Sequence, residues 1–179
     1  MSRSRAPLWS ALLVFVTGCG THAEDRVKSL DFSLPALRGG APIQLAQYRD
    51  KIVYVDVWAS WCTPCLRSMP ELEALREKFH GQRFEVIAVN VDSDAAAARA
   101  FLERVGARYP VALDRNGAQM RARIGDEADL AALPVGFLLD GRGNIRLVHR
   151  GYSPGQSAFL AEHIETLLAE LRVGSDTRR

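Results

Sequence analysis

The sequence predicts a single α/β domain in which a central mixed β-sheet is flanked by helices on both faces. Three observations predict this fold. Segments rich in β-branched and aromatic residues alternate with segments in which apolar residues recur at helical spacing. The first strand-like segment, 52–58, is apolar apart from Asp56, which is typical of a strand buried on both faces. Two strand-like segments joined by the turn 141–144, followed by a last helix, favour a mixed sheet.

An amphipathic helix is expected soon after segment 52–58. Its apolar residues recur every three or four positions, and Gly81 can end it. The apolar stripe consists of Leu66, Met69, Leu72, Leu75 and Phe79. The charged residues of the same helix are expected to form a solvated face, and they are Glu71, Glu73, Arg76, Glu77 and Lys78.

The remaining elements repeat the alternation. A strand is expected at 84–91, and Ser93 and Asp94 can cap a helix over 95–105 that ends at Gly106. Beyond it, the pattern predicts a strand at 111–113, a helix at 118–124, strands at 135–140 and 145–149, and a helix at 156–171.

The composition is that of one folded domain with short extensions. The chain has 179 residues, of which 47% are apolar and 25% are charged. The formal net charge is +2, and the cationic residues are scattered among acidic ones. The sequence has no basic block and no interleaving of aromatic and basic side chains, so nucleic acid is not an expected partner.

The N-terminus has the features of an export signal. Arg3 and Arg5 precede an apolar run at 8–16, which is too short to span a bilayer as a permanent helix. The run ends in Val-Thr-Gly-Cys at 16–19, which resembles the lipobox of bacterial lipoproteins and implies cleavage before Cys19 and lipidation of that cysteine. The alternative is an ordinary cleaved leader in which Cys19 has no role.

These features divide the chain into four parts. We expect a signal peptide at 1–18, a lipid anchor and tether at 19–28, a folded domain at 29–173 and a polar tail at 174–179. The protein is then expected on the periplasmic side of a bacterial membrane, held through the lipid on Cys19, where disulfides can persist.

Cys62 and Cys65 are separated by two residues, a spacing with three common explanations: half of a zinc site, a structural disulfide, or a redox pair. A closed zinc site needs four ligands, and the chain has neither a second cysteine pair nor histidines paired at ligand spacing, so no metal is expected. A structural bridge over so short a loop would remove little entropy from the unfolded chain. The spacing therefore favours a redox pair.

The position of the pair supports this chemistry. A helix is expected to start at about Cys62, after the strand and a tight turn, so the Cys62 thiol lies at a helix N-terminus. Unpaired backbone N–H groups and the helix dipole there favour the thiolate, which is the attacking species. Cys65, one turn further on, can resolve a mixed disulfide, and Pro64 suits the first helical turn because it has no N–H.

The segment Trp-Cys-Thr-Pro-Cys at 61–65, following an apolar strand, is similar to the active site of the thioredoxin superfamily. The closer match is to the TlpA/ResA-like branch, and it extends over segments 32–34, 54–62 and 137–140 and the turn at 39–40. The resemblance implies a thioredoxin-like fold that carries the insertion characteristic of this branch.

Proteins of this branch are typically tethered reductants that deliver electrons to disulfides outside the cytoplasm, often during cytochrome c or copper-centre assembly. For this chain the resemblance implies disulfide-containing client proteins, a membrane electron donor of the DsbD type, and no cofactor. It also implies that the branch's insertion lies at about 93–113.

By position, Pro134 matches the cis-proline of the superfamily, which lies against the active-site disulfide, while the backbone of the preceding residue, here Leu133, pairs with the client chain. Trp61, Thr63 and Pro64 are also expected to contact the client. The alternative for Pro134 is a trans proline at the start of an edge strand.

Asp56 and Ser68 mark a departure from the branch. The branch usually has a glutamate at the position of Ser68, and serine cannot act as that acid. Asp56, however, matches the buried aspartate of thioredoxin, and burial raises a carboxyl pKa, which prepares Asp56 to take a proton from Cys65. Asp56 is therefore expected to be the general acid/base, and the alternative is a structural aspartate satisfied by hydrogen bonds. A second departure is the pair Val135-Gly136, where the branch often has threonine or serine after the proline.

Reduction is the expected direction of electron flow, because Thr63-Pro64 lacks the histidine found before the second cysteine in strongly oxidising relatives. An oxidase or isomerase with the same site residues is one alternative. A copper-binding chaperone of the Sco type is another, although that family spaces its cysteines one residue further apart and adds a histidine ligand.

Overall fold

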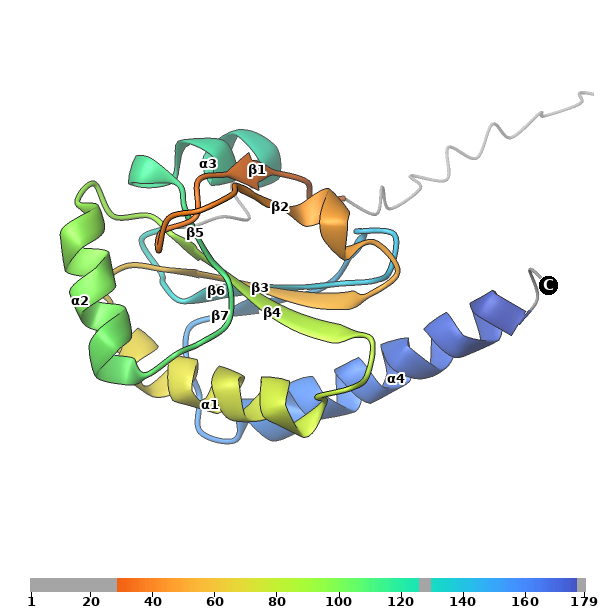
Figure 1. The fold of residues 1–179 in the computed structure, drawn as a ribbon. Coiled ribbons are helices and arrows are strands. Elements are labelled where there is room, and N and C mark those ends of the chain that lie inside the picture. The colour runs from red at the N-terminus through yellow and green to blue at the C-terminus, as the bar shows by residue number, and fades with distance from the viewer. Residues whose placement is uncertain (1–28, 126–129, 177–179) are drawn as a thin grey trace, which may run out of the picture.

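A five-stranded mixed sheet forms the centre of the computed structural model, which describes residues 29–125 and 130–176 (Figure 1). Its strands are β3 at Ile52–Trp58, β4 at Phe84–Asn90, β5 at Val111–Leu113, β6 at Val135–Leu139 and β7 at Ile145–Arg150. The strand order is β5-β4-β3-β6-β7, with β3, β4 and β5 mutually parallel and β6 and β7 antiparallel to their neighbours.

Helices and two short strands surround this sheet. They are α1 at Cys65–Lys78, α2 at Ala95–Val105, α3 at Ala118–Ile124, α4 at Gln156–Asp176, β1 at Ser33–Leu34 and β2 at Ile43–Gln44. The helices α1 and α4 pack side by side on one face, whereas α3 and the β1–β2 pair cover the other face, and α2 lies beside α1 (Figure 1). Two short 3-10 helices follow β2 and β5, at Leu45–Tyr48 and Arg115–Gly117. The predicted mixed sheet with helices on both faces is confirmed.

Strand β3 occupies the middle of the sheet, and all seven of its residues are buried. Because side chains alternate along a strand, Tyr54, Asp56 and Trp58 point to one face and the valines to the other. The ring of Trp58 lies 5.0 Å from that of Phe101 in α2. A buried charge therefore shares a face of the sheet with a buried aromatic core.

The predicted boundaries of α2 are also confirmed, and their physical cause is visible. The Asp94 carboxylate accepts a hydrogen bond from the Ala96 N–H at 2.8 Å, which satisfies one of the free donors of the first turn. Gly106 ends the helix in the left-handed conformation, with φ of 70°, which glycine adopts at little cost. Helix α2 and strand β5 together occupy most of the predicted insertion at 93–113.

Two predicted helix boundaries are wrong, and the predicted ends of β4, β6 and β7 differ from the observed ones by one residue each. Helix α1 begins at Cys65 rather than at Cys62, and α4 continues through Asp176, so the predicted polar tail at 174–179 begins inside a helix. The predicted leader, Cys19 and the tether up to residue 28 lie outside the described residues. Among the residues that are described, no helix is both long and apolar enough to cross a membrane.

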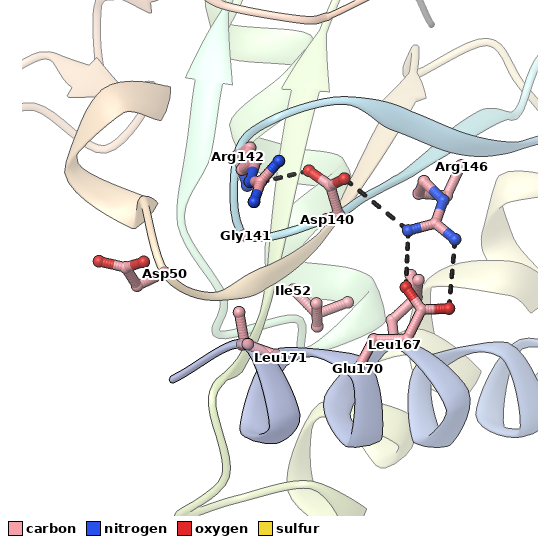
Figure 2. Close-up of a pocket in the computed structure, with 10 residues that line it drawn as sticks. Asp50, Ile52, Asp140, Gly141, Arg142, Arg146, Leu167, Glu170 and Leu171 are labelled. Carbon is pink, nitrogen blue, oxygen red and sulfur yellow. Dashed lines mark hydrogen bonds and ion pairs between the residues drawn. The ribbon is translucent and has the colours of Figure 1, made fainter. Parts of the chain in front are cut away.

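A cavity of about 260 Å³ opens at the end of β3 that is remote from the cysteines (Figure 2). Arg146 of β7 forms one of its walls, with ion pairs to Glu170 of α4 at 2.8 Å and to Asp140 at 3.8 Å. These pairs tie the last helix to the edge of the sheet. None of the described residues that line this cavity is a cysteine.

Candidate active site

Cys62 and Cys65 lie in the turn between β3 and α1 and are joined by a disulfide, with their Cα atoms 5.4 Å apart. The turn is held by two backbone hydrogen bonds, from the Cys62 N–H to the Ala59 carbonyl at 3.1 Å and from the Cys65 N–H to the Cys62 carbonyl at 3.2 Å. Cys62 keeps 3% of its surface exposed and Cys65 keeps none. An attacking thiol can therefore reach the disulfide only from the Cys62 side.

Although the helix starts later than predicted, Cys62 still faces its N-terminus. Pro64 takes the N-cap position, where its missing N–H costs nothing, and Cys65 is the first helical residue. The Cys65 N–H lies 3.3 Å from the Sγ of Cys62 and donates a hydrogen bond to it. A backbone donor and the positive end of the α1 dipole thus act on the Cys62 sulfur, and both favour its thiolate.

The surface around the pair is partly apolar. The side chain of Trp61 is 62% exposed, although aromatic side chains of this size are usually buried, and Leu66 is exposed as well. Thr63 is exposed and Pro64 is half-buried. These residues adjoin Cys62 and Cys65 in the chain and can contact an incoming polypeptide.

The Leu133–Pro134 peptide bond is cis, as the resemblance implies. Val135, the next residue, is paired with Val57, the penultimate residue of β3, so Pro134 lies at the same end of the sheet as the cysteines. The Pro134 carbonyl accepts a hydrogen bond from the Gly151 N–H at 2.7 Å.

Asp56 is 1% exposed and sits between Ala88 of β4 and Gly136 of β6, neither of which offers a polar side chain. Its Oδ2 atom is buried without a hydrogen-bond partner among the described residues. Burial raises the pKa of this carboxyl from 3.8 to about 7. A carboxyl in this environment can gain and lose a proton near pH 7.

Asp92 holds the turn that leads into the cysteines, and the sequence reasoning missed it. Its carboxylate accepts the Ser60 N–H at 2.9 Å and the side-chain amide of Asn90 at 2.8 Å. Asp92 follows β4 and Ser60 follows β3, and the ends of adjacent parallel strands meet. The polar residues Asn90 and Asp92, at the end of a buried strand, are the sequence signal that could have identified this contact.

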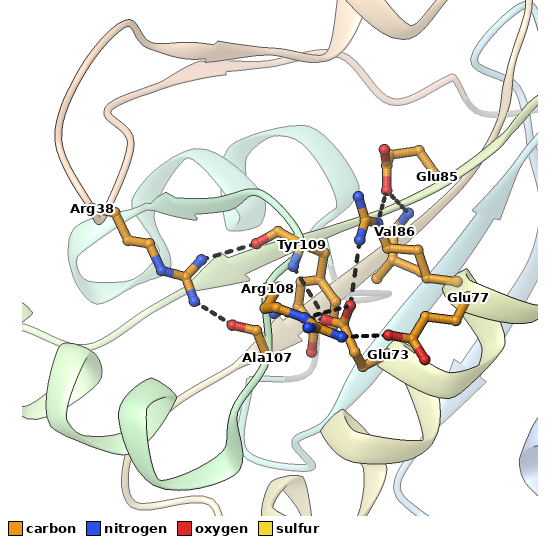
Figure 3. A network of polar contacts seen from close by, with 9 residues as sticks. Arg38, Glu73, Glu77, Glu85, Val86, Ala107, Arg108 and Tyr109 are labelled. Carbon is orange, nitrogen blue, oxygen red and sulfur yellow. Dashed lines mark hydrogen bonds and ion pairs between the residues drawn. The ribbon is translucent and has the colours of Figure 1, made fainter. Parts of the chain in front are cut away.

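Glu73 corrects the prediction of a fully solvated face on α1. Its side chain is buried and accepts hydrogen bonds from the backbone N–H groups of Arg108 at 2.6 Å and Tyr109 at 3.3 Å (Figure 3). The guanidinium of Arg38 donates to the carbonyl of Tyr109 at 3.0 Å. Tyr109 is thus fixed through both of its backbone polar groups, and its hydroxyl lies in the core with no hydrogen-bond partner in the described part of the chain.

Ser68 occupies the position at which the branch usually has a glutamate. It is buried, and its hydroxyl donates to the carbonyl of Cys65 at 3.4 Å. No group of three or more His, Cys, Asp or Glu side chains gathers as a possible metal site within residues 29–125 and 130–176.

A cysteine pair at a strand-to-helix turn, a cis-proline at the same end of the sheet and a central mixed sheet define a redox protein of thioredoxin-like fold. The chain is a thiol-disulfide oxidoreductase, and it belongs to the Redoxin family, whose profile matches residues 22–164.

Similar proteins have names that are consistent with this assignment. Thiol-disulfide oxidoreductase ResA of Geobacillus kaustophilus is 31% identical over 137 residues, which are 76% of this chain and 74% of the relative. ResA of Bacillus subtilis is 30% identical over 63% of this chain and 60% of its own length. Among solved structures, a putative thiol:disulfide interchange protein DsbE from Chlorobium tepidum has a TM-score of 0.70 and 34% identity, over 79% of this chain and 95% of its own.

Proposed function

We propose that this protein reduces disulfides in client proteins outside the cytoplasm, through a dithiol-disulfide cycle of Cys62 and Cys65 with Asp56 as proton carrier. The single observation that carries the mechanism is the buried Asp56 carboxyl in the strand that leads into the cysteines. Its pKa lies near neutrality, and its Oδ2 atom has no hydrogen-bond partner within residues 29–125 and 130–176.

The cycle starts from the reduced pair. The Cys62 thiolate attacks one sulfur of the client disulfide, the client S–S bond breaks, and a mixed disulfide forms while one client thiolate leaves. Cys65 gives its proton to the Asp56 carboxylate and attacks the Sγ of Cys62. The second client thiolate leaves and takes the proton from Asp56, so two electrons pass to the client and the pair becomes a disulfide.

The limited stabilisation of the Cys62 thiolate supports reduction as the direction of the reaction. In the described structure its sulfur accepts one hydrogen bond, from the Cys65 N–H, and the intervening residues Thr63 and Pro64 carry no positive charge. Strong oxidants owe their potential to a highly stabilised thiolate, so weaker stabilisation favours a reductant.

The lipobox-like sequence ending in Cys19 supports a lipid anchor on the periplasmic side of a membrane. Reduced thiols do not last in an oxidising compartment, so the oxidised pair would be returned to the dithiol by a membrane electron donor of the DsbD type. Cytochrome c or copper-centre maturation is a process that would consume such electrons.

The redox state of the pair in growing cells tests the direction. Free thiols are trapped with a mass-labelled alkylating agent, and we expect Cys62 and Cys65 to be mostly labelled, that is, reduced. A pair found mostly as the disulfide in unstressed cells would contradict a reductant and favour the oxidase or isomerase alternative.

The reduction potential gives the same answer in vitro. We expect a value toward about −270 mV, whereas a value near about −120 mV would indicate a strong oxidant. The copper-chaperone alternative predicts stoichiometric Cu(I) binding by the reduced protein that is lost in Cys62→Ser, and absence of such binding excludes it.

A further inference from the structure

Gly136 has a neighbour that explains why it is a glycine. A Cβ atom added at this position would overlap the hydroxyl and Cζ atoms of Tyr54 and would lie only 2.9 Å from its Cε2. The phenol of Tyr54 therefore occupies the space that a side chain at residue 136 would otherwise fill. This position is also the second departure from the TlpA/ResA-like pattern that the sequence shows.

The register of the sheet places two titratable groups on either side of this space. Gly136 pairs directly with Asp56 of β3 and directly with His149 of β7. Directly opposed residues in antiparallel strands point to the same face, with Cβ atoms about 5 Å apart. Asp56, the Tyr54 hydroxyl and His149 thus form a row across one face of the sheet, with the hydroxyl in the middle.

The row leads from the core to the edge of the sheet. Asp56 is fully buried, whereas His149 is half-buried on β7, the last strand, with its ring 6.5 Å from that of Phe159 in α4. Burial lowers the pKa of His149, which favours the neutral imidazole, and a neutral imidazole has one ring nitrogen that can accept a proton. When the Cys62–Cys65 disulfide is reduced again, Asp56 has to regain a proton from solvent before it can supply one to Cys65, so a buried proton carrier needs such a route.

We propose that the Tyr54 hydroxyl relays protons between Asp56 and His149, and that Gly136 leaves the space in which it does so. For this, protonated His149 gives its proton to the hydroxyl oxygen while the hydroxyl passes its own proton to ionised Asp56, so one proton enters and Tyr54 stays neutral. When Asp56 is ionised, the hydroxyl donates to the carboxylate and stabilises it. Tyr54 acts on the reaction through Asp56 and is therefore a positioning residue.

Other titratable groups near Asp56 come from two further elements. Tyr109, from the segment before β5, interacts with the Asp56 charge, and Glu73 and Arg38 act in turn on Tyr109. Glu73 acts on Tyr109 from helix α1, while β4 places Ala88, which cannot titrate, opposite Asp56. Burial, and after it the Asp56 charge, raises the pKa of Tyr54.

The inference rests on the proposed role of Asp56, so its first test does not depend on catalysis. The Asp56 carboxyl carbon is titrated by carbon-13 NMR in the full chain and in Tyr54→Phe, which keeps the ring over Gly136 and removes only the hydroxyl. We expect the pKa of Asp56 to rise by about one pH unit in Tyr54→Phe. Tyr48→Phe, which removes a half-buried phenol elsewhere, is the matched control and should leave it unchanged. An unmoved pKa in Tyr54→Phe overturns the proposal.

The second test follows the route to the surface. The rate at which dithiothreitol reduces the Cys62–Cys65 disulfide is measured between pH 5 and 9. We expect both Tyr54→Phe and His149→Gln to slow it about tenfold near pH 7, and the double variant to be no slower than either. His163→Gln, which replaces a histidine that also stacks on Phe159, should behave like the unmodified protein.

If the rate decreases of the two single variants add up in the double variant, the relay is wrong. Two residues on one proton path should not have independent effects on the rate. Asp56→Asn separates the two proposals. If dithiothreitol reduces the disulfide of Asp56→Asn as fast as that of the unmodified protein, the proposed catalytic role of Asp56 is wrong. The titration of Asp56 in Tyr54→Phe then still decides whether Tyr54 acts on Asp56.

Discussion

At the scale of single residues, the two cysteines differ in accessibility. Cys62 reaches the surface and receives the Cys65 N–H, whereas Cys65 is fully enclosed. This difference assigns the attack on the client to Cys62 and the release of the client to Cys65.

The assignment predicts different behaviour of two serine variants. We expect Cys65→Ser to accumulate mixed disulfides with client proteins, because Cys62 still attacks but nothing resolves the product. Cys62→Ser should form none. The complexes are separated on non-reducing gels and identified by mass spectrometry. Mixed disulfides through Cys65 in the Cys62→Ser variant would reverse the assignment.

At the scale of elements, Glu73 joins α1 to the segment that leads into β5. Glu73→Ala leaves two backbone N–H groups without their acceptor, and an unpaired buried donor costs about 1–3 kcal/mol. We expect urea unfolding to show a loss of about 2 kcal/mol. Glu77→Ala is the matched control, because Glu77 lies one turn further on the same helix and makes an exposed ion pair with Arg108.

An exposed pair contributes less than about 1 kcal/mol, so Glu77→Ala should cost little. Equal losses in Glu73→Ala and Glu77→Ala would show that the buried hydrogen bonds of Glu73 add nothing to stability.

The elements also show what local sequence can predict. Helices α2 and α3 and strand β5 match their predicted ranges because caps and periodicity are local signals. The start of α1 was predicted too early, since Cys62 is held in a turn by its bond to Ala59 and the first helical residue follows Pro64. Strands β1 and β2 have two residues each, too few to show alternation.

The residues of the site also differ in whether a local sequence signal predicts them. Cys62, Cys65, Asp56 and Pro134 stand in recognisable local contexts, so the sequence predicts them. The contacts of Asp92 with Ser60 and of Glu73 with Tyr109 join residues 32 and 36 positions apart, and only the folded sheet brings them together. Helical spacing placed Glu73 on a charged face but could not show which segment covers it.

At the scale of the whole molecule, the buried carboxyl sets how stability varies with pH. Folding raises the pKa of Asp56 from 3.8 to about 7, so the folded state favours the protonated form. This contribution is fully present below pH 4 and is lost as pH rises through 7, by about 4 kcal/mol in total.

Asp56→Asn removes that titration. We expect it to be more stable than the unmodified protein at pH 8 and to lose much less stability between pH 5 and pH 8, as measured by urea unfolding of the disulfide form. Asp94→Asn, which changes an exposed carboxylate at the start of α2, should keep the original slope. An unchanged slope in Asp56→Asn would mean that Asp56 is already ionised at pH 5.

The overlap at Gly136 has a consequence for how this sequence can change over time. Any side chain at position 136 collides with a tyrosine at position 54, and a smaller residue at 54 leaves a void over a bare glycine. A substitution at only one of the two positions therefore lowers the stability of the fold. In related chains the side-chain sizes at positions 54 and 136 should therefore covary. A homologue with a branched residue at 136 should have a small residue at 54.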